Sequence, residues 1–340
     1  MELVETKVLS PNQLAEAVRL LQQGEVVAFP TETVYGLGAN ALDPQAVARI
    51  FQAKGRPQDN PLIVHCTGIT QVSQFVQEIS PEVRLVMDAF WPGPLTIVLK
   101  KTDIIPTVVT AGLDTVAVRV PNHPLALELL SNTNFPLAAP SANTSGRPSP
   151  TRAEHVFSDL QGKIPAILDG GETGWGLEST VLDCTVTPFR VLRPGGVTLE
   201  ELSELVPVAL SEDVAGQSEI PRSPGMKYQH YAPEAEVFLV SGDNSAAQIL
   251  QLSESYFSKG QAVGVMTWNE RAELFPKLKV LPMGPQGDLH SLANKLYHLL
   301  READVLGLDV LFIESVDEER LGLAIMNRLR KAAKNRELRT

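Results

Sequence analysis

The chain has 340 residues, of which 44% are hydrophobic and 20% charged, and its formal net charge is -11. That length suggests two domains of roughly 150 residues each and allows a packed core without a metal or disulfide staple. The acidic balance argues against a protein that coats nucleic acid through a broad basic face. Cys66 and Cys184 lie far apart without CxxC spacing, so they predict buried free thiols and not a disulfide framework or a zinc site.

The first ten residues and the lengths of the apolar runs predict where in the cell the protein is located. The first ten residues, MELVETKVLS, lack the pattern of a signal peptide, and no run reaches 18 apolar residues. We therefore expect a cytoplasmic protein with no membrane contact.

Signals for helices and short apolar runs alternate along residues 1–206. Ser10 with Gln13 has the spacing of a capping box, and Pro44 and Pro81 each follow a capping residue. Helices are expected at residues 10–23, 43–55, from 80 onward and at 198–206, and strands at residues 26–29, 62–65, 95–99, 116–120, 166–168, 180–182 and 190–192.

The pattern changes after residue 206. A turn-rich stretch at 207–233 is followed by apolar runs and helical patterns that alternate again. Strands are expected at residues 237–240, 262–266 and 310–313, and helices at 245–258, 291–303 and 318–334. This alternation predicts an α/β domain with a largely parallel sheet, so we expect a catalytic domain at 1–206, a linker at 207–233 and a C-terminal domain at 234–340.

Gly36, Gly38 and Ala41 match the spacing of a dinucleotide-binding fingerprint. The fingerprint needs a helix that starts directly after the glycines, and the next helix is expected only at residue 43. The match is therefore discounted. No GxxxxGK[ST] is present either, which argues against a Walker-type ATPase.

The stretch PTETVYGLG at residues 30–38 is expected to be a loop just beyond a strand, and it carries two hydroxyls, a carboxylate and a phenol. Open α/β sheets bind ligands at that position. The alternative is a glycine-rich turn with solvated threonines.

Two cations, Lys54 and Arg56, flank a glycine at an expected helix end, shortly before Asn60 and His65. A point charge beside a planar guanidinium suits a polyphosphate. Charge compensation at a helix end explains Lys54 well but Arg56 poorly. A lone histidine such as His65, at the end of an apolar strand, is more often a satisfied core residue.

Further polar groups follow in the order Thr115 and Arg119, then the loop PSANTSGRPSP at residues 140–150, then Glu178 with Ser179 and finally Arg193. Arg119 shares a strand face with Thr115 and would interrupt a buried strand. It therefore needs an acidic partner or an anionic ligand.

These blocks, in this order, resemble the YrdC-type threonylcarbamoyl-AMP synthases. The resemblance rests on PTETVYGLG, KGRP with NPLIVH, PSAN, ESTV and RPGG, and it covers about residues 5–206. SPGMKYQHYAP, at residues 223–233, resembles the linker of the longer form of that enzyme. The resemblance implies a YrdC-like twisted mixed-sheet domain plus a smaller Rossmann-like α/β C-terminal domain.

The resemblance also implies a reaction. The amine of L-threonine captures carbon dioxide from bicarbonate, the carbamate attacks the α-phosphorus of ATP, and pyrophosphate leaves threonylcarbamoyl-AMP. A separate transferase passes the threonylcarbamoyl group to tRNA, with which a weak contact is also expected. Mg²⁺ should accompany ATP, held by the phosphates, with no metal site in the protein.

Carried over residue by residue, the resemblance gives two sites. It implies catalytic roles for Lys54 and Arg56. It assigns L-threonine binding to Thr33, His65, Arg119, Ala139 and Ser179. It assigns ATP binding to Lys54, Arg56, Asn60, Thr115, Ser141, Asn143, Ser149, Arg193 and Tyr231.

Two alternatives stay open at this stage. One is an RNA-binding module of the same fold without catalysis, against which the net charge counts. The other is a carbamoyl-adenylate enzyme of hydrogenase maturation, which normally carries further domains that this chain lacks. For the enzyme reading, we predict that residues 223–233 form a lid that excludes water from the nucleotide site; a passive linker is the alternative.

Overall fold

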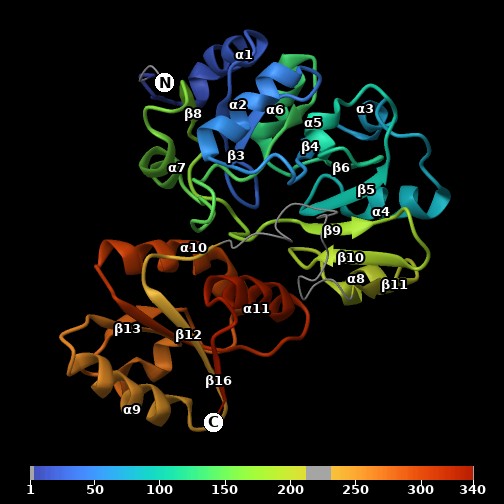
Figure 1. Ribbon diagram of the computed structural model, residues 1–340. Helices are drawn as coiled ribbons and strands as arrows, with labels where there is room; N and C mark the ends of the chain where they lie inside the picture. Colours follow the sequence, from blue (N-terminus) through green and yellow to red (C-terminus); the bar gives the residue numbers. More distant parts are fainter. Residues whose placement is uncertain (1–3, 212–230, 340) are drawn as a thin grey trace. The chain divides into compact units, whose positions relative to one another are not determined.

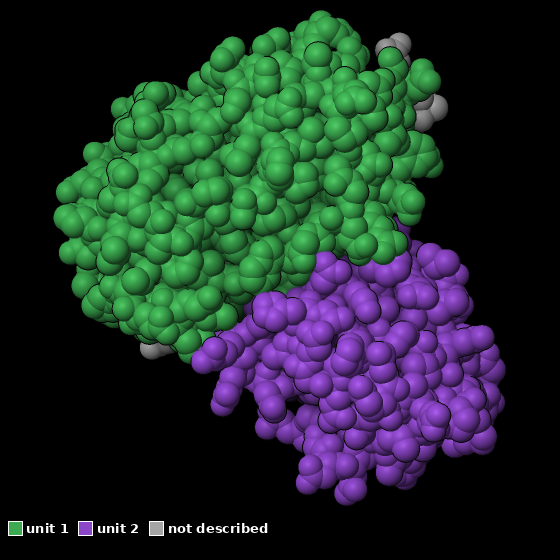
Figure 2. All heavy atoms as spheres, turned by 180° about the vertical axis from the view of Figure 1, so that it is seen from behind, with its two compact units in different colours: residues 1–145, 149–228 green, residues 146–148, 229–340 purple. Residues whose placement is uncertain are grey.

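The structure is a computed structural model that describes residues 4–211 and 231–339, and it divides into two compact units (Figure 1 and Figure 2). Unit 1 takes residues 1–145 and 149–228, and unit 2 takes residues 146–148 and 229–340. Each unit has its own sheet.

The described part of unit 1 is built on one mixed sheet of eleven strands in the order β1-β8-β2-β3-β7-β4-β6-β5-β9-β10-β11. Parallel and antiparallel pairs are mixed along it: β2, β3, β7 and β4 are joined by antiparallel pairs, whereas β4 runs parallel to β6, which runs antiparallel to β5. The strands are β1 (Lys7–Leu9), β2 (Val27–Phe29), β3 (Gly36–Asn40), β4 (Ile63–His65), β5 (Leu95–Lys100), β6 (Thr115–Arg119), β7 (Leu137–Ala138), β8 (Ala166–Leu168), β9 (Thr180–Asp183), β10 (Phe189–Arg193) and β11 (Val208–Leu210).

Helices cover both faces of this sheet, because successive side chains of a strand point to opposite faces. Val27 and Phe29 pack with α1 (Leu14–Gln22) and α6 (Pro124–Thr133). Ala28 belongs to the core on the other face. The remaining helices of unit 1 are η1 (Pro11–Gln13), α2 (Pro44–Lys54), α3 (Ile69–Val72), α4 (Pro81–Phe90), α5 (Thr107–Thr110), α7 (Ala153–Leu160) and α8 (Leu199–Ser203).

The helix starts read from the sequence are confirmed by their caps. Asp43 accepts from the N–H of Gln45 at the start of α2, and Ser80 accepts from Val83 at the start of α4. These side chains satisfy backbone donors that the first turn leaves open.

Unit 2 contains a parallel sheet of five strands in the order β14-β13-β15-β12-β16. Its two central strands, β13 and β15, are buried along their whole length, so both of their faces are covered and they read as largely apolar runs. This confirms the Rossmann-like α/β class expected for the C-terminal half. The elements are β12 (Glu236–Ser241), α9 (Ser245–Phe257), β13 (Val263–Thr267), η3 (Asn269–Leu274), β14 (Lys279–Pro282), α10 (Leu289–Val305), β15 (Val310–Glu314), α11 (Leu321–Ala332) and β16 (Glu337–Arg339).

The largest difference from the sequence expectation is β3. Residues 36–38 were expected in a loop, but Gly36 and Gly38 lie in a strand that pairs with β2. The ring of Phe29 lies across both glycines, and a Cβ atom at Gly38 would come within 2.8 Å of it. The glycines therefore make room for an aromatic ring on a strand.

The chain beyond residue 206 also differs from the expectation. Strand β11 falls in the stretch expected as a linker, and it extends the sheet of unit 1 by pairing with β10. Residues 212–230, which hold most of the predicted lid at 223–233, lie outside the described residues. Within the described residues, no helix is both long and apolar enough to cross a membrane.

Candidate active site

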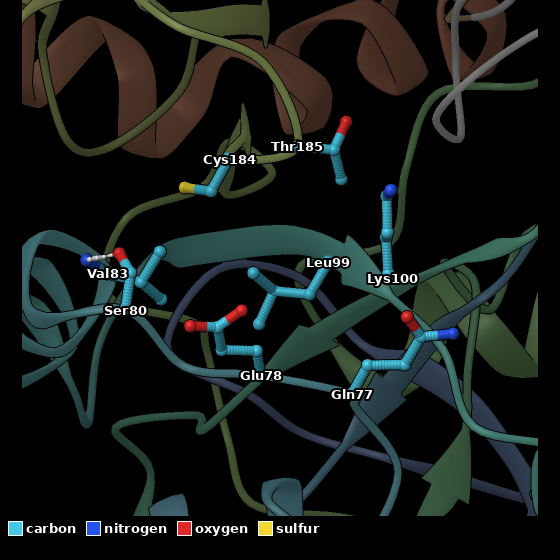
Figure 3. Close-up of a pocket in the computed structure, with 8 residues that line it drawn as sticks. All are labelled: Gln77, Glu78, Ser80, Val83, Leu99, Lys100, Cys184 and Thr185. Atoms are coloured by element: carbon cyan, nitrogen blue, oxygen red, sulfur yellow. Dashed lines mark hydrogen bonds between the residues drawn. The ribbon is translucent and has the colours of Figure 1, made fainter.

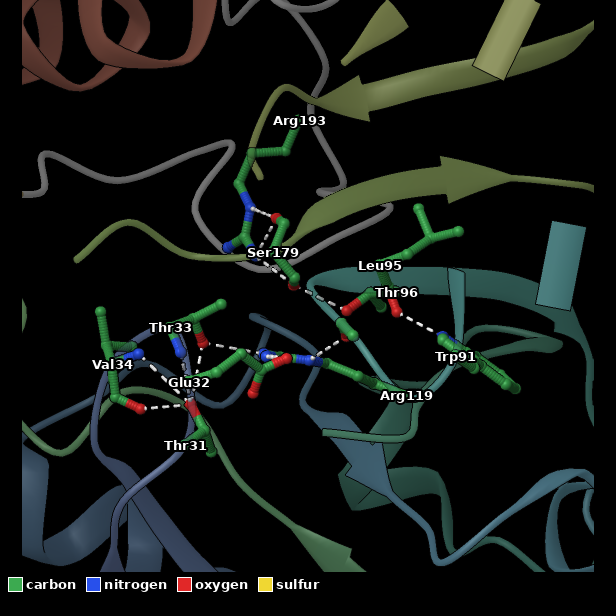
Figure 4. A network of polar contacts seen from close by, with 11 residues as sticks. Thr31, Glu32, Thr33, Val34, Trp91, Leu95, Thr96, Arg119, Ser179 and Arg193 are labelled. Atoms are coloured by element: carbon green, nitrogen blue, oxygen red, sulfur yellow. Dashed lines mark hydrogen bonds and ion pairs between the residues drawn. The ribbon is translucent and has the colours of Figure 1, made fainter. Parts of the chain in front are cut away.

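Arg119 is the centre of a buried polar network at the end of β6 (Figure 4). Its Nη1 donates to the hydroxyl of Thr33 at 3.0 Å, and its Nε donates to the carbonyl of Gly93 at 3.2 Å. Thr33 in turn lies 2.9 Å from the hydroxyl of Thr31. The loop after β2 and the end of β6 are thus joined, although their sequences are far apart.

The acidic partner that Arg119 requires is Glu32. Its Oε1 lies 2.8 Å from Arg119 Nη2, and both side chains are almost fully buried. The distance is that of an ion pair, but the geometry is not that of a hydrogen bond. Neither Glu32 oxygen accepts a hydrogen bond from any described residue. We take the pair as electrostatic, since a separation of 2.8 Å leaves a strong Coulomb attraction in a buried place.

Ser179 and Arg193 form a second part of the network. Arg193 Nη2 donates to the Ser179 carbonyl at 2.9 Å and to its hydroxyl at 3.2 Å, and Ser179 Oγ lies 2.8 Å from Thr96 Oγ1. Gly195 permits this approach, because a Cβ there would come within 2.3 Å of the Thr180 nitrogen. The RPGG and ESTV blocks are therefore packed directly on one another.

His65 lies opposite Arg119 in the register of β4 and β6. Burial, assisted by the charge of Arg119, lowers the pKa of His65 to about 3, so its imidazole is neutral at physiological pH. Its ring meets the Phe29 ring edge-on at 5.9 Å. Ala139 follows β7 and donates its N–H to the carbonyl of Ile63 at 2.9 Å.

Lys54 holds the PSAN loop. Its ammonium group, at the buried end of α2, donates to the carbonyls of Ser141 and Asn143. Ser141 Oγ also donates to the side-chain carbonyl of Asn143 at 2.5 Å. The loop that follows β7 is thus fixed by a cation from α2.

Arg56 and Asn60 form the turn after α2, which Gly55 ends in a left-handed conformation with φ 61°. Arg56 Nη2 donates to the carbonyls of Asn60 and Pro61 at 3.4 and 3.2 Å. The side-chain amide of Asn60 is buried, and no described residue bonds to either of its polar atoms. A buried amide without a hydrogen-bond partner in the described protein is suited to bind a polar group of a ligand.

The remaining predicted residues are more scattered. Ser149 donates to Glu178 Oε1 at 2.6 Å. Thr115 is half-buried at the opposite end of β6 from Arg119, about 13 Å along the strand at the usual rise per residue. Tyr231 belongs to unit 2, where its ring lies 5.2 Å from that of Tyr297.

Several residues that matter in the network were missed or given no role by sequence reasoning. Tyr35 was read as a candidate site phenol, but its hydroxyl donates to the carbonyl of Gly171 at 2.7 Å and lies 3.2 Å from Asp169. These bonds tie the loop after β2 to the loop after β8. Burial raises the pKa of Tyr35, so its hydroxyl keeps its proton. Glu32 stands inside the motif that drew attention, whereas Thr96 carries no sequence signal at all.

A cavity of about 300 Å³ lies elsewhere in unit 1, beside the start of α4 (Figure 3). None of the described residues that line it belongs to the network of Arg119. Its lining residues are Gln77, Glu78, Ser80, Val83, Leu99, Lys100, Cys184 and Thr185.

Metal ligands are not gathered at the site. Among residues 4–211 and 231–339, no group of three or more His, Cys, Asp or Glu side chains has the arrangement of a metal site.

Comparison with known proteins places the chain in a family. The family Sua5_yciO_yrdC, described as telomere recombination, matches residues 19–195, and the family described as threonylcarbamoyl-AMP synthase, C-terminal domain, matches residues 197–334. A threonylcarbamoyl-AMP synthase of Bacillus subtilis is 48% identical over 98% of this chain and 97% of its own length. The chain belongs to the Sua5/YciO/YrdC family of threonylcarbamoyl-AMP synthases.

Other members of the Sua5/YciO/YrdC family agree in sequence and structure. A threonylcarbamoyl-AMP synthase of Pyrococcus abyssi is 48% identical over 93% of each chain. The solved structure of P. abyssi Sua5 complexed with L-threonine covers 98% of this chain and 99% of its own, with a TM-score of 0.92 and 45% identity. This confirms the two-domain enzyme family and the fold that the sequence motifs indicated.

Proposed function

We propose that this protein makes threonylcarbamoyl-AMP from L-threonine, bicarbonate and ATP and releases pyrophosphate. The observation that carries the proposal is the buried network of Arg119, Thr33 and Ser179, in a chain of which 98% matches the structure of a relative complexed with L-threonine. A guanidinium at the end of a buried strand suits a carboxylate ligand. Thr33, His65, Arg119, Ala139 and Ser179 are the proposed L-threonine site.

The nucleotide is proposed to bind beside it. Asn60 offers a buried amide with unused donors and acceptors, and the Lys54 ammonium adds positive charge near the loop that it fixes. The full proposed set is Lys54, Arg56, Asn60, Thr115, Ser141, Asn143, Ser149, Arg193 and Tyr231.

The chemistry that these residues support is electrostatic. Bicarbonate loses water to give carbon dioxide, and the threonine amine, in its neutral form, adds to it and releases a proton to water. One carbamate oxygen then attacks the α-phosphorus, and the bond from the α-phosphorus to pyrophosphate breaks. Lys54 and Arg56 would stabilise the negative charge that develops on the departing pyrophosphate. Buried groups held in place by their own hydrogen bonds need no reorganisation during the reaction.

Mg²⁺ is expected to accompany ATP and to shield charge on the triphosphate. The described residues offer no cluster of carboxylates for it, so the phosphates and water would hold it. The product is proposed to pass to a separate transferase that modifies tRNA, with at most a weak contact between this chain and tRNA. Such a reaction belongs in the cytoplasm.

The test is mass spectrometry of the product formed from ATP, bicarbonate and a mixture of amino acids. Threonylcarbamoyl-AMP and pyrophosphate should appear only when threonine and bicarbonate are both present. A product formed without threonine would contradict the proposal. Absence of any product, with RNA affinity that falls steeply with salt, would favour an RNA-binding module instead.

Selectivity among amino acids gives a sharper prediction. A site that hydrogen-bonds the substrate hydroxyl should reject valine strongly, whereas serine lacks only a methyl group worth about 1–3 kcal/mol. The measurement is kcat/KM for pyrophosphate release with each amino acid. Equal values for threonine and valine would contradict the predicted hydroxyl contact.

A further inference from the structure

We propose that Glu32 is the counter-ion that recognises the α-ammonium group of the amino-acid substrate. The proposal rests on the proposed function, in which Arg119 binds the substrate carboxylate. It adds a recognition residue to that site, in the loop between β2 and β3.

The first argument is the unusual state of the Glu32 side chain. It is 8% exposed, yet neither of its oxygens accepts a hydrogen bond from any described residue. Buried carboxylates are costly to keep unless hydrogen bonds satisfy their lone pairs. A side chain in this state, next to a proposed ligand site, is suited to a donor that arrives with the ligand.

The second argument is charge. The charges of Arg119 and Glu32 cancel each other, because Nη2 of Arg119 lies 2.8 Å from Oε1 of Glu32. A ligand with only a carboxylate would leave one uncompensated negative charge in a buried place. A zwitterion adds no net charge, because its carboxylate faces Arg119 while its ammonium faces Glu32. The pair is therefore complementary to an α-amino acid.

The neighbouring His123 does not add a second positive charge beside Glu32. Burial lowers the pKa of His123, and the nearby charge of Glu32 opposes this only in part, so the ring is neutral at pH 7. Thr33 and Thr31 are also occupied, since they bond to Arg119, to each other and to the backbone of Val34. An ammonium donor is what the Glu32 oxygens lack among these neighbours.

The experiment compares two ligands that differ only in the group that Glu32 would contact. Affinities of the full-length protein for L-threonine and for (2S,3R)-2,3-dihydroxybutanoate, in which a hydroxyl replaces the ammonium, are measured by calorimetry. The wild type should bind threonine more tightly. Glu32→Gln should weaken threonine binding by about 10- to 100-fold, as expected for a hydrogen bond between charged groups, and change binding of the hydroxy acid by less than threefold.

Matched variants complete the design. Glu32→Asp keeps the charge on a shorter side chain and should lose less threonine affinity than Glu32→Gln. Glu128→Gln, on the exposed side of α6, should bind both ligands as the wild type does. If Glu32→Gln does not fold, the preference of the wild type for threonine over the hydroxy acid still tests the proposal.

Each contrary outcome has a distinct meaning. If Glu32→Gln weakened the binding of both ligands equally, Glu32 would only position Arg119. If the wild type bound both ligands with equal affinity, there would be no contact with the ammonium group. Either result overturns the proposal. A wild type that binds the hydroxy acid but not threonine would also overturn it. Binding of neither ligand would instead overturn the proposed threonine site itself.

Discussion

At the scale of single residues, burial decides the charge state of the site. His65 and Arg119 face each other across neighbouring strands, and both are almost fully buried. Water cannot stabilise a second positive charge there, so the pKa of His65 falls to about 3 while Arg119 keeps its charge beside Glu32. His65 can therefore contact a substrate only as a neutral ring.

This charge state predicts how stability depends on pH. The folded state holds His65 neutral, with a pKa below the unfolded value of about 6.5. The contribution of His65 to the free energy of unfolding is therefore fully present above pH 6.5 and is lost as pH falls toward 3. Between pH 6.5 and 5 the free energy of unfolding should drop by about 2 kcal/mol from this group. Denaturant titrations of the wild type and His65→Asn at the two pH values measure it, and an equal drop in both proteins would contradict the assignment.

Arg56 combines a structural contact with a proposed catalytic charge. Arg56→Ala removes long hydrogen bonds to the carbonyls of Asn60 and Pro61, so we expect a loss of about 1 kcal/mol in unfolding free energy. Turnover should fall much more, by about 2–4 kcal/mol in transition-state stabilisation. Steady-state pyrophosphate release, with Arg56→Lys as the charge-preserving control, separates the two effects. Near wild-type turnover of Arg56→Ala would contradict the phosphate role.

At the scale of elements, the site is built from loops that pack closely because a glycine lies at the contact. Gly195 meets the backbone of residues 178–180, and this approach brings Arg193 onto Ser179. Backbone cannot move aside as a flexible side chain can. The β9–β10 pair therefore positions two predicted site residues together.

Gly195→Ala should destabilise unit 1 by about 1–3 kcal/mol or more, as overpacking does, and should weaken threonine binding because Ser179 is displaced. Thermal unfolding and calorimetry measure both effects. Gly68→Ala is the matched control, because its backbone is extended at φ 171° and no atom lies within 4 Å of the added Cβ. A Gly195→Ala protein as stable as this control would contradict the packing argument.

At the scale of the whole molecule, the described part of unit 1 has its own cores and a continuous sheet. This favours independent folding of unit 1.

A fragment of residues 1–211 should fold cooperatively, because it retains β11 and the bond from the Ser211 nitrogen to the Val191 carbonyl. A fragment of residues 1–206 lacks that edge strand and should unfold at a lower temperature, by about 2–4 °C for each kcal/mol lost. Calorimetric scans of both fragments test this. Identical unfolding temperatures would show that β11 adds no stability.

Features with local causes could be predicted from the sequence. The capping residues before Pro44 and Pro81 fixed two helix starts, and the apolar runs fixed the parallel sheet of unit 2. The motif blocks also identified the family and showed that Arg119 needs a partner. These signals are readable because each depends on residues a few positions apart.

The partners of the motif residues depend on the three-dimensional fold. Arg119 bonds to Thr33 across 86 positions, Lys54 to the Ser141 carbonyl across 87, and the Tyr35 hydroxyl to Asp169 across 134. Such pairs depend on the order of strands in the sheet, which no local pattern encodes. That order makes Tyr35 a structural tie and Lys54 the anchor of the PSAN loop. It also brings Glu32 to Arg119 at the end of β6, because strand order and burial, not sequence distance, set the electrostatic partners.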